Sequence, residues 1–197
     1  MKYAIVYSSR TGNTRQLAEK AFEVLGEREG GECVYFGEVP AGPLEGATAQ
    51  RFREAEILYA GFWTDKGNAD SGILSLFKEL GKTDNMPPEI ILFGTAGFGA
   101  DQTYYDRIIQ AAACELPESV KLKASFMCQG KMQQGVLERY RSMLEANPQD
   151  GRAKLMVDNY HAALTHPDGT DMAAFQHFLI SSVPAAGMGE QLFVTEL

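Results

Sequence analysis

The sequence has few cysteines and no long apolar segment. Its 197 residues contain Cys33, Cys114 and Cys128, which lie far apart and form no CxxC pair. No apolar run approaches the roughly 20 residues that a membrane-spanning helix needs, and the first residues are typical of a strand rather than of a signal peptide. We therefore expect a cytoplasmic protein with reduced, mostly buried thiols and no membrane partner.

Basic charge is also scarce. The chain has 18 Lys and Arg against 26 Asp and Glu, a formal net charge of -8 that is spread along the whole sequence. A nucleic-acid-binding protein needs basic clusters to neutralise phosphates, so no nucleic-acid partner is expected. The three histidines, His161, His166 and His177, lack the carboxylate or thiolate neighbours that metal-ligand spacing requires, so no metal site is expected.

Apolar runs alternate with amphipathic stretches along the chain. This pattern predicts an α/β protein with a five-stranded, doubly wound parallel sheet that is covered by helices on both faces. Strands are expected at 3–7, 33–36, 56–62, 90–93 and 122–128. The intervening segments are amphipathic and predict helices, one of which is capped by Asp70 and a later one by Asp168. The length suits a single domain over 1–197, with the sheet in 1–130 and a helical C-terminal part in 131–197.

The loop between the first strand and its helix is rich in hydroxyl groups. Ser8, Ser9, Thr11 and Thr14 surround Gly12 at the start of the helix. Backbone N–H groups, the positive end of the helix dipole and hydroxyl donors can converge on one phosphate there. Plain N-capping needs only one Ser or Thr, so the four hydroxyls favour a phosphate site.

Several other phosphate-binding classes lack their signature in this loop. No GxxxxGK[ST] is present, which excludes a P-loop NTPase, and no GxGxxG follows the strand, which speaks against a Rossmann dinucleotide site. A phosphatase nucleophile of the cysteine type is also missing from the loop. The third strand ends in Gly61-Phe62-Trp63, where a receiver domain would need an Asp.

The segment from Ser9 to Thr14, with the order Ser-Arg-Thr-Gly-Asn-Thr, resembles the FMN-phosphate loop of flavodoxins. The resemblance implies FMN as cofactor and a sheet order of 2-1-3-4-5, whereas the helical C-terminal extension departs from it. It also implies that the loops after strands three and four hold the isoalloxazine ring, with Trp63 as a stacking residue and Phe98 as the alternative. The cofactor-binding residues that the resemblance predicts are Ser9, Arg10, Thr11, Gly12, Asn13, Thr14, Phe62, Trp63, Thr64, Asp65, Lys66, Gly67, Thr95, Ala96, Gly97, Phe98 and Gly99.

Two later motifs, Cys128-Gln129-Gly130-Lys131 and His166-Pro167-Asp168, are similar to a bacterial subgroup of flavodoxins associated with bilin reduction. The loop after strand three departs from the Pro-Thr-Trp order of many flavodoxins and carries Lys66 where an acidic or neutral residue is common. These departures concern the redox potentials and the partner rather than the cofactor.

The resemblance implies an electron carrier that exchanges single electrons with redox partner proteins, namely a reductase and an acceptor enzyme, as a monomer or homodimer. No acid, base or nucleophile is needed, so no catalytic residue is expected. An alternative is an FMN-dependent NAD(P)H:quinone-type oxidoreductase, for which Leu192-Phe193-Val194 could supply a dimer surface. A third hypothesis is a regulatory domain of this fold without flavin.

Overall fold

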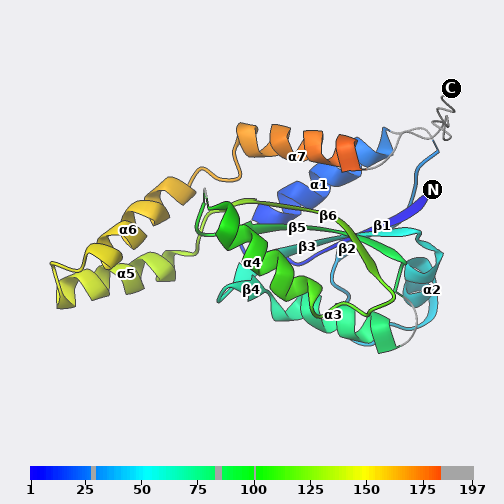
Figure 1. Ribbon diagram of the computed structural model, residues 1–197, viewed down its shortest axis with the longest axis horizontal. Helices are drawn as coiled ribbons and strands as arrows, with labels where there is room; N and C mark the ends of the chain where they lie inside the picture. Colours follow the sequence, from blue (N-terminus) through cyan, green and yellow to red (C-terminus); the bar gives the residue numbers. More distant parts are fainter. Residues whose placement is uncertain (28–29, 83–85, 100, 183–197) are drawn as a thin grey trace, which may run out of the picture.

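The computed structural model describes residues 1–27, 30–82, 86–99 and 101–182, and it shows a parallel sheet between two layers of helices (Figure 1). The parallel strands are β1 (Lys2–Tyr7), β2 (Glu32–Glu38), β3 (Ile57–Asp65), β5 (Glu89–Ala96) and β6 (Lys121–Gln129). Their order is β2-β1-β3-β5-β6, with parallel pairing throughout. The expected doubly wound sheet of order 2-1-3-4-5 is confirmed, because β5 and β6 are the fourth and fifth strands of that prediction.

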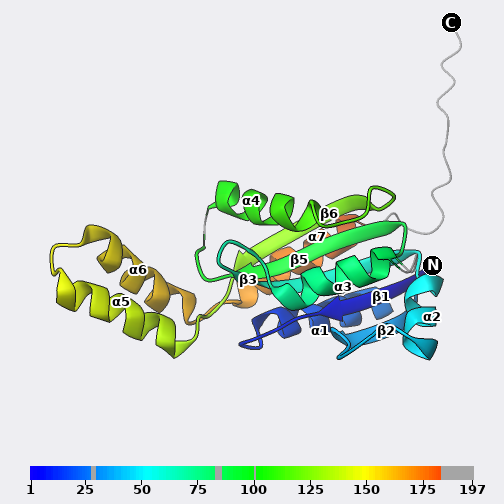
Figure 2. The ribbon, with the colours of Figure 1, turned by 90° about the horizontal axis from the view of Figure 1, so that it is seen from below.

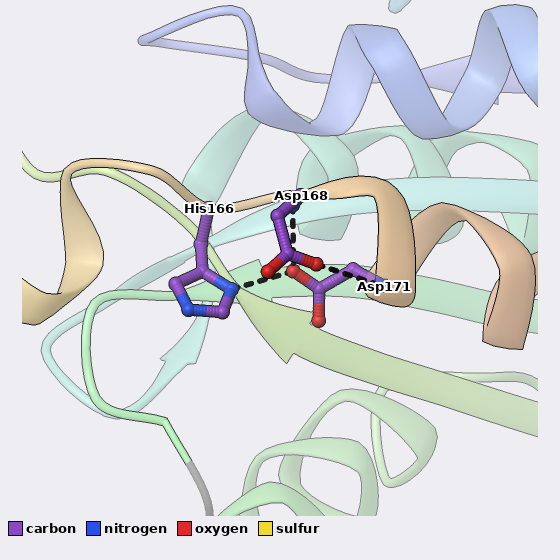
Figure 3. A group of neighbouring side chains, drawn as sticks. All are labelled: His166, Asp168 and Asp171. Atoms are coloured by element: carbon purple, nitrogen blue, oxygen red, sulfur yellow. Dashed lines mark hydrogen bonds and ion pairs between the residues drawn. The ribbon is translucent and has the colours of Figure 1, made fainter.

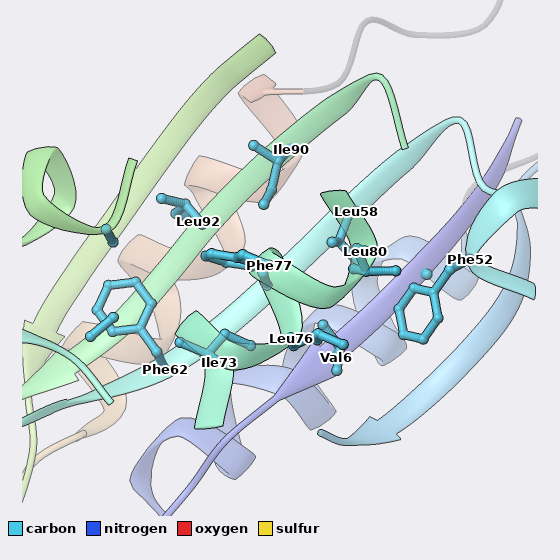
Figure 4. Packing of buried hydrophobic residues seen from close by; sticks show 14 of the residues in the cluster. Val6, Phe52, Leu58, Phe62, Ile73, Leu76, Phe77, Leu80, Ile90 and Leu92 are labelled. Carbon is cyan, nitrogen blue, oxygen red and sulfur yellow. The ribbon is translucent and has the colours of Figure 1, made fainter. Parts of the chain in front are cut away.

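The two faces of the sheet bury alternate strand residues, as the two-residue period of a strand requires. On one face, Tyr3 and Ile5 of β1 pack beneath α1 (Asn13–Gly26) and α7 (Gly169–Ser182). On the other face, Ala4 and Val6 join a cluster with α2 (Gly46–Glu54), α3 (Ser71–Lys82) and α4 (Gln102–Ala113) (Figure 4). The strands are buried on both faces, which explains their nearly continuous apolar sequences.

The helical C-terminal part divides into two pieces. Helices α5 (Gln134–Ala146) and α6 (Gly151–Ala163) pair with each other and project from the body (Figures 1 and 2). Helix α7 instead returns to the sheet, where Phe175 and Leu179 are fully buried and the Phe175 ring lies 5.3 Å from that of Phe93, centroid to centroid. The whole region was expected to be an extension, but α7 completes the helical layer and only the α5–α6 hairpin is added to the fold.

The third strand is longer than expected and ends in a tight hairpin. It continues to Asp65 and pairs antiparallel with β4 (Asn68–Ala69), which the sequence analysis placed in a loop. The two connecting residues, Lys66 and Gly67, have φ angles of 50° and 84°. Two-residue hairpin turns of type I′ require positive φ at both positions, which glycine adopts freely. A strand pattern of two residues was too short to recognise in the sequence.

The expected helix caps and the thiols can be compared directly with the structure. Asp70 Oδ1 accepts hydrogen bonds from the N–H groups of Gly72 and Ile73, which confirms the predicted cap of α3.

Of the cysteines, Cys128 is buried, but Cys33 is half-buried and Cys114 is exposed, so the expectation of mostly buried thiols was wrong. Within the described ranges, no helix combines the length and apolar character that crossing a bilayer requires.

Candidate cofactor site

A cavity of about 400 Å³ lies at the carboxyl ends of β3 and β5, beside the start of α1. In doubly wound sheets this is the edge at which ligands bind. Its lining consists of Arg10, Thr11, Asn13, Trp63, Thr64, Asp65, Lys66, Gly67, Thr95, Ala96, Gly97, Phe98, Tyr104, Gly130, Lys131, Met132, Gln133, Val136, Arg139 and Tyr140. Another hollow of about 410 Å³ lies along β2, but the three loops predicted to hold the cofactor do not contribute to it.

The cavity brings together residues from all three predicted loops. Twelve of the seventeen predicted residues line it, and the other five, which lie outside the lining, are Ser9, Gly12, Thr14, Phe62 and Gly99. Phe62 is fully buried in the core between the sheet and α3 (Figure 4). Its side chain therefore stabilises the fold beneath the site. Contacts between any of the seventeen residues and FMN stay a prediction.

Thr14 is also buried, and it connects two strands rather than facing the cavity. Its hydroxyl lies 3.2 Å from the Phe62 carbonyl oxygen, to which it donates, and 3.0 Å from the Thr95 hydroxyl. The side chain is fully buried, whereas Thr11 lies in the cavity wall. The two threonines therefore have different roles: Thr11 is placed to contact a ligand, and Thr14 holds the phosphate loop against β3 and β5.

The first turn of α1 is open for an anion. Gly12 forms the N-cap with a φ of 84°, a left-handed conformation that glycine adopts without strain, and it has no side chain to cap the helix. The Ser9 hydroxyl accepts a hydrogen bond from the N–H of Arg15. In the described part of the chain, no hydrogen bond occupies the N–H groups of Asn13 or Thr14. Free N–H groups at a helix start are suited to a phosphate.

Two buried polar atoms of the lining residues lack a partner among the described residues, namely Asn13 Oδ1 and Thr64 Oγ1. A buried polar atom without a hydrogen bond costs on the order of 1–3 kcal/mol. Asn13 comes from the first loop and Thr64 from the end of β3, so the two atoms belong to different parts of the cavity. They fit a ligand with polar groups along its length.

Aromatic side chains lie on both loops that are predicted to hold the ring. Trp63 and Phe98 both line the cavity, and each is partly exposed. The guanidinium carbon of Arg10 lies 5.1 Å from the centroid of the Trp63 ring, which is within cation–π distance. Tyr104 packs edge-on to Phe98. A flat ligand can therefore stack on Trp63, on Phe98 or between them.

Asp70 joins the first two loops behind the cavity. Its Oδ1 accepts a hydrogen bond from the Ser8 hydroxyl at 2.8 Å, in addition to the two N–H groups of the α3 cap. Burial raises the pKa of the Asp70 carboxyl above its ordinary value, and these donors offset only part of that effect. Asp70 therefore fixes the end of β1 relative to the start of α3.

The structure adds a side of the site that the sequence analysis missed. The residues after β6 and the first turns of α5 supply Gly130, Lys131, Met132, Gln133, Val136, Arg139 and Tyr140 to the lining. Helix α6 is attached to the loop after β5, because Asn159 Nδ2 donates to the Gly97 carbonyl oxygen at 2.9 Å and Asn159 Oδ1 accepts from Gln129. The only sequence signal for this side was the motif at 128–131, which resembled a subgroup of the family but did not indicate that these residues line a ligand site.

A chain of hydrogen bonds connects the first loop to the segment that follows the α5–α6 hairpin. Asn13 Nδ2 donates to Thr11 Oγ1 at 2.8 Å and to the Lys131 carbonyl oxygen at 2.9 Å. The Lys131 N–H then donates to the His166 carbonyl oxygen at 3.0 Å. Gly130 lies close beneath Asn13, since a Cβ on Gly130 would approach Asn13 Nδ2 to 2.6 Å. The position of the first loop therefore depends on residues far along the chain.

His166, Asp168 and Asp171 cluster at the start of α7 (Figure 3), with candidate ligand atoms all within 4.8 Å of one another. The expectation that the histidines lack carboxylate neighbours was therefore wrong for His166. The carboxylates already have local roles, however. Asp168 Oδ1 accepts from the N–H of Asp171 and of Thr170, which confirms the predicted cap, and Asp171 Oδ2 accepts from the Asp168 N–H and lies 2.6 Å from His166 Nδ1. The hydrogen bond from the backbone N–H of Asp171 is the main cause that holds the pKa of Asp168 below its ordinary value. We interpret the cluster as a helix cap.

The family is shown by comparison with known proteins. A family model for the flavodoxin domain matches residues 4–180. The chain belongs to the flavodoxin family. A similar curated protein is the flavodoxin-like domain-containing protein BilS of Clostridioides difficile (strain CD3), with 27% identity over 172 residues that cover 85% of this chain and 88% of that protein.

Solved flavodoxins have the same fold. Oxidised Flavodoxin 2 from Bacillus cereus matches with a TM-score of 0.52 and 15% identity, over 92% of this chain and 97% of that one. A WrbA-like flavodoxin from Agrobacterium tumefaciens matches with a TM-score of 0.50 and 12% identity, over 92% of this chain and 99% of that one. At these identities the similarity concerns the fold.

Flavodoxin domains bind FMN, so FMN is the cofactor of this chain. The residues of the cavity fit it: the open start of α1 suits the phosphate, and Trp63 and Phe98 suit the flat ring. The unpartnered oxygens of Asn13 and Thr64 provide acceptors for its polar edge or its hydroxyl chain.

Proposed function

We propose that this flavodoxin-family protein is an electron carrier that uses FMN to exchange single electrons with two redox partner proteins, a reductase and an acceptor enzyme. Proteins of this family transfer electrons to redox partners. Bound FMN supplies the redox chemistry, since it can accept and release electrons one at a time. The task of the chain is then to hold the cofactor, to tune its potentials and to keep its edge accessible to a partner.

The composition of the cavity wall is the observation that carries this proposal. The part of the lining that the structure describes contains no histidine, cysteine, serine or glutamate. Its ionisable groups are the two tyrosines, Tyr104 and Tyr140, and exposed charged side chains, among them its single carboxylate, Asp65. A reductase acting on a bound metabolite commonly needs a group placed for proton transfer. A carrier needs no such group, because its partners exchange electrons with the cofactor and no bound metabolite has to be protonated.

Each part of the wall has a defined role in this proposal. The start of α1 with Thr11 binds the phosphate, and Trp63 or Phe98 orients the ring. The Lys66–Gly67 turn lies beside the ring, and the positive charge of Lys66 favours the reduced, more negative cofactor. Lys66 is exposed, so solvent and salt reduce this effect.

The FMN-dependent NAD(P)H:quinone-type oxidoreductase remains the second candidate. The observation that favours it is the additional wall from α5 and the residues just before it, where Met132, Val136 and Tyr140 line one side of the site. Such a wall is what a second substrate above the ring would need. The segment Leu192-Phe193-Val194, which the sequence analysis offered as a dimer surface, lies outside the described residues.

Steady-state assays separate the two candidates. We expect the FMN-loaded protein to oxidise NAD(P)H in the presence of a quinone no faster than an equal concentration of free FMN. Adding a flavoprotein NADPH reductase, with cytochrome c as the final acceptor, should raise electron flow by an order of magnitude over the reductase alone. The same assay with the apo-protein is the control. Sustained NAD(P)H oxidation without the reductase would contradict the carrier proposal and favour the oxidoreductase.

Cytoplasmic location, the monomeric or homodimeric state and an acceptor enzyme of bilin reduction stay predictions. The flavin-free alternative is excluded for this chain by its family, because FMN binding is the property that the family shares.

A further inference from the structure

The mouth of the cofactor cavity is ringed by basic side chains. Arg10, Lys66, Lys131 and Arg139 all line the cavity and are all exposed. They come from four separate segments: the phosphate loop, the β3–β4 turn, the loop after β6 and helix α5. Asp65 is the one acidic residue of the lining that the structure describes. We refer to these four basic residues as the basic rim.

This rim contrasts with the rest of the molecule. The chain carries a formal net charge of -8, and several basic residues elsewhere are paired with carboxylates, for example Lys2 with Glu54 and Lys123 with Glu89. In the described part of the structure, no ion pair neutralises any residue of the rim. The described lining of the cavity thus carries four basic residues and one acidic residue, in a chain whose net charge is negative.

The phosphate of FMN does not account for the whole rim. The phosphate is expected at the start of α1, where Arg10 is the nearby member of the rim. Lys66, Lys131 and Arg139 belong to other segments. Arg139 is held above the ring of Tyr140, with its guanidinium carbon 5.5 Å from the ring centroid, so this charge has a preferred position beside the mouth.

We infer that the basic rim docks the acidic face of a partner redox protein, with the α5–α6 hairpin forming one side of the contact. The inference rests on the proposed carrier function and specifies the chemistry of the partner. A stable protein–protein contact buries about 800 Å² on each side, which is more than a cavity mouth offers. Helix α5 lines the cavity, and the α5–α6 hairpin projects from the body (Figures 1 and 2), which enlarges the available surface. It also exposes Leu155 and Met143, apolar side chains of the kind that contribute to interfaces.

The direction in which salt changes the association rate shows whether the basic rim or the net charge of the protein governs the encounter with an acidic partner. Attraction between the rim and an acidic partner accelerates association by about 10-fold to 10³-fold at low salt, and salt weakens it because the Debye length falls from about 30 Å at 0.01 M to about 3 Å at 1 M. If the overall charge of -8 governed the encounter instead, an acidic partner would be repelled and added salt would raise its rate.

The test uses two forms of one acceptor. Holo-protein reduced anaerobically is mixed by stopped flow with native cytochrome c, which is basic, or with cytochrome c whose lysines have been succinylated, which makes it acidic. We expect the succinylated form to be reduced roughly 10-fold faster or more at low salt, with the difference disappearing at high salt. Faster reduction of the native form, or equal rates at low salt, would overturn the inference.

Matched variants connect the effect to the rim. The double variant Lys131→Gln/Arg139→Gln should lose most of the preference for the acidic form. The control Arg53→Gln/Lys82→Gln removes the same charge from exposed positions at the ends of α2 and α3, outside both the cavity lining and the hairpin, and should retain it. Equal loss in both variants would overturn the inference. The bound flavin spectrum of each variant is recorded first, so that loss of FMN is recognised separately.

The remaining outcomes separate this inference from the proposed function. If ferricyanide, a small anion, is strongly favoured at low salt but succinylated cytochrome c is not, the rim serves a small acceptor and the protein-docking inference fails. If the reduced holo-protein transfers electrons to neither form of cytochrome c nor to ferricyanide, the carrier function itself fails. Electron transfer with a preference for native cytochrome c preserves the function and rejects the acidic partner.

Discussion

The apo-protein is expected to bind FMN about 10²-fold to 10⁴-fold more tightly than riboflavin, the same molecule without its phosphate. The start of α1 is uncapped by a side chain, and Thr11 lines the cavity next to it. Two hydrogen bonds to a charged group contribute about 1.5–3 kcal/mol each, and tenfold in affinity corresponds to about 1.4 kcal/mol. Titration calorimetry with both ligands measures the ratio.

Threonine variants show whether the phosphate is the cause. Thr11→Ala should weaken FMN binding by about 1–3 kcal/mol and leave riboflavin binding unchanged. Thr170→Ala, in the exposed first turn of α7, is the control and should change neither. Equal affinities for FMN and riboflavin in the unmodified protein would place the phosphate elsewhere and reject the site at the start of α1.

Tryptophan fluorescence should lose most of its intensity when FMN binds and recover when FMN is removed. Trp63 is the single tryptophan of the chain and lines the cavity, so its emission reports on this site alone. An aromatic pair contributes about 0.5–1.5 kcal/mol beyond the area that it buries. We therefore expect Trp63→Ala to weaken FMN binding by more than tenfold once the lost area is included, as measured by flavin fluorescence.

Phe98 provides the matched comparison, because it lines the opposite loop of the same cavity. If Trp63 is the main stacking residue, Phe98→Ala should weaken FMN binding less than Trp63→Ala does. Tryptophan emission that does not respond to FMN, together with a larger effect of Phe98→Ala, would assign the stacking role to Phe98.

The sheet and the location of the site could be predicted because their signals are local. Apolar strands alternating with amphipathic helices predicted the layers, and the hydroxyl-rich loop from Ser9 to Thr14 predicted a phosphate site. Loops that follow parallel strands meet at one edge of the sheet, so the sequence alone predicts that Trp63, Thr95 and Phe98 lie together, as they do in the cavity lining.

The wall from α5 could not be predicted, since nothing in the sequence shows where an added helix packs. From the sequence, Val136 and Tyr140 are predicted only to lie on the apolar face of an amphipathic helix. Their place beside the cavity depends on long-range hydrogen bonds, such as those from Asn159 and Gln129 to Gly97. The same limit explains Phe62 and Thr14: sequence adjacency to a ligand loop does not tell whether a side chain faces the cavity or the core.

The β3–β4 turn could be predicted only in part. Gly67 is typical of a turn. The two-residue hairpin could not be predicted, however, because it requires a positive φ at Lys66, which a non-glycine residue rarely adopts. The structure places this turn in the cavity wall, where its peptide groups and the Lys66 charge can influence the cofactor.

An anaerobic redox titration of the FMN-loaded protein, followed by visible absorbance, tests the carrier account most directly. The account predicts two resolved one-electron steps, each with a slope of about 59 mV per tenfold change in the ratio of reduced to oxidised protein. A single two-electron step, with a slope of about 30 mV, would contradict it and would favour an enzyme that accepts electron pairs from NAD(P)H.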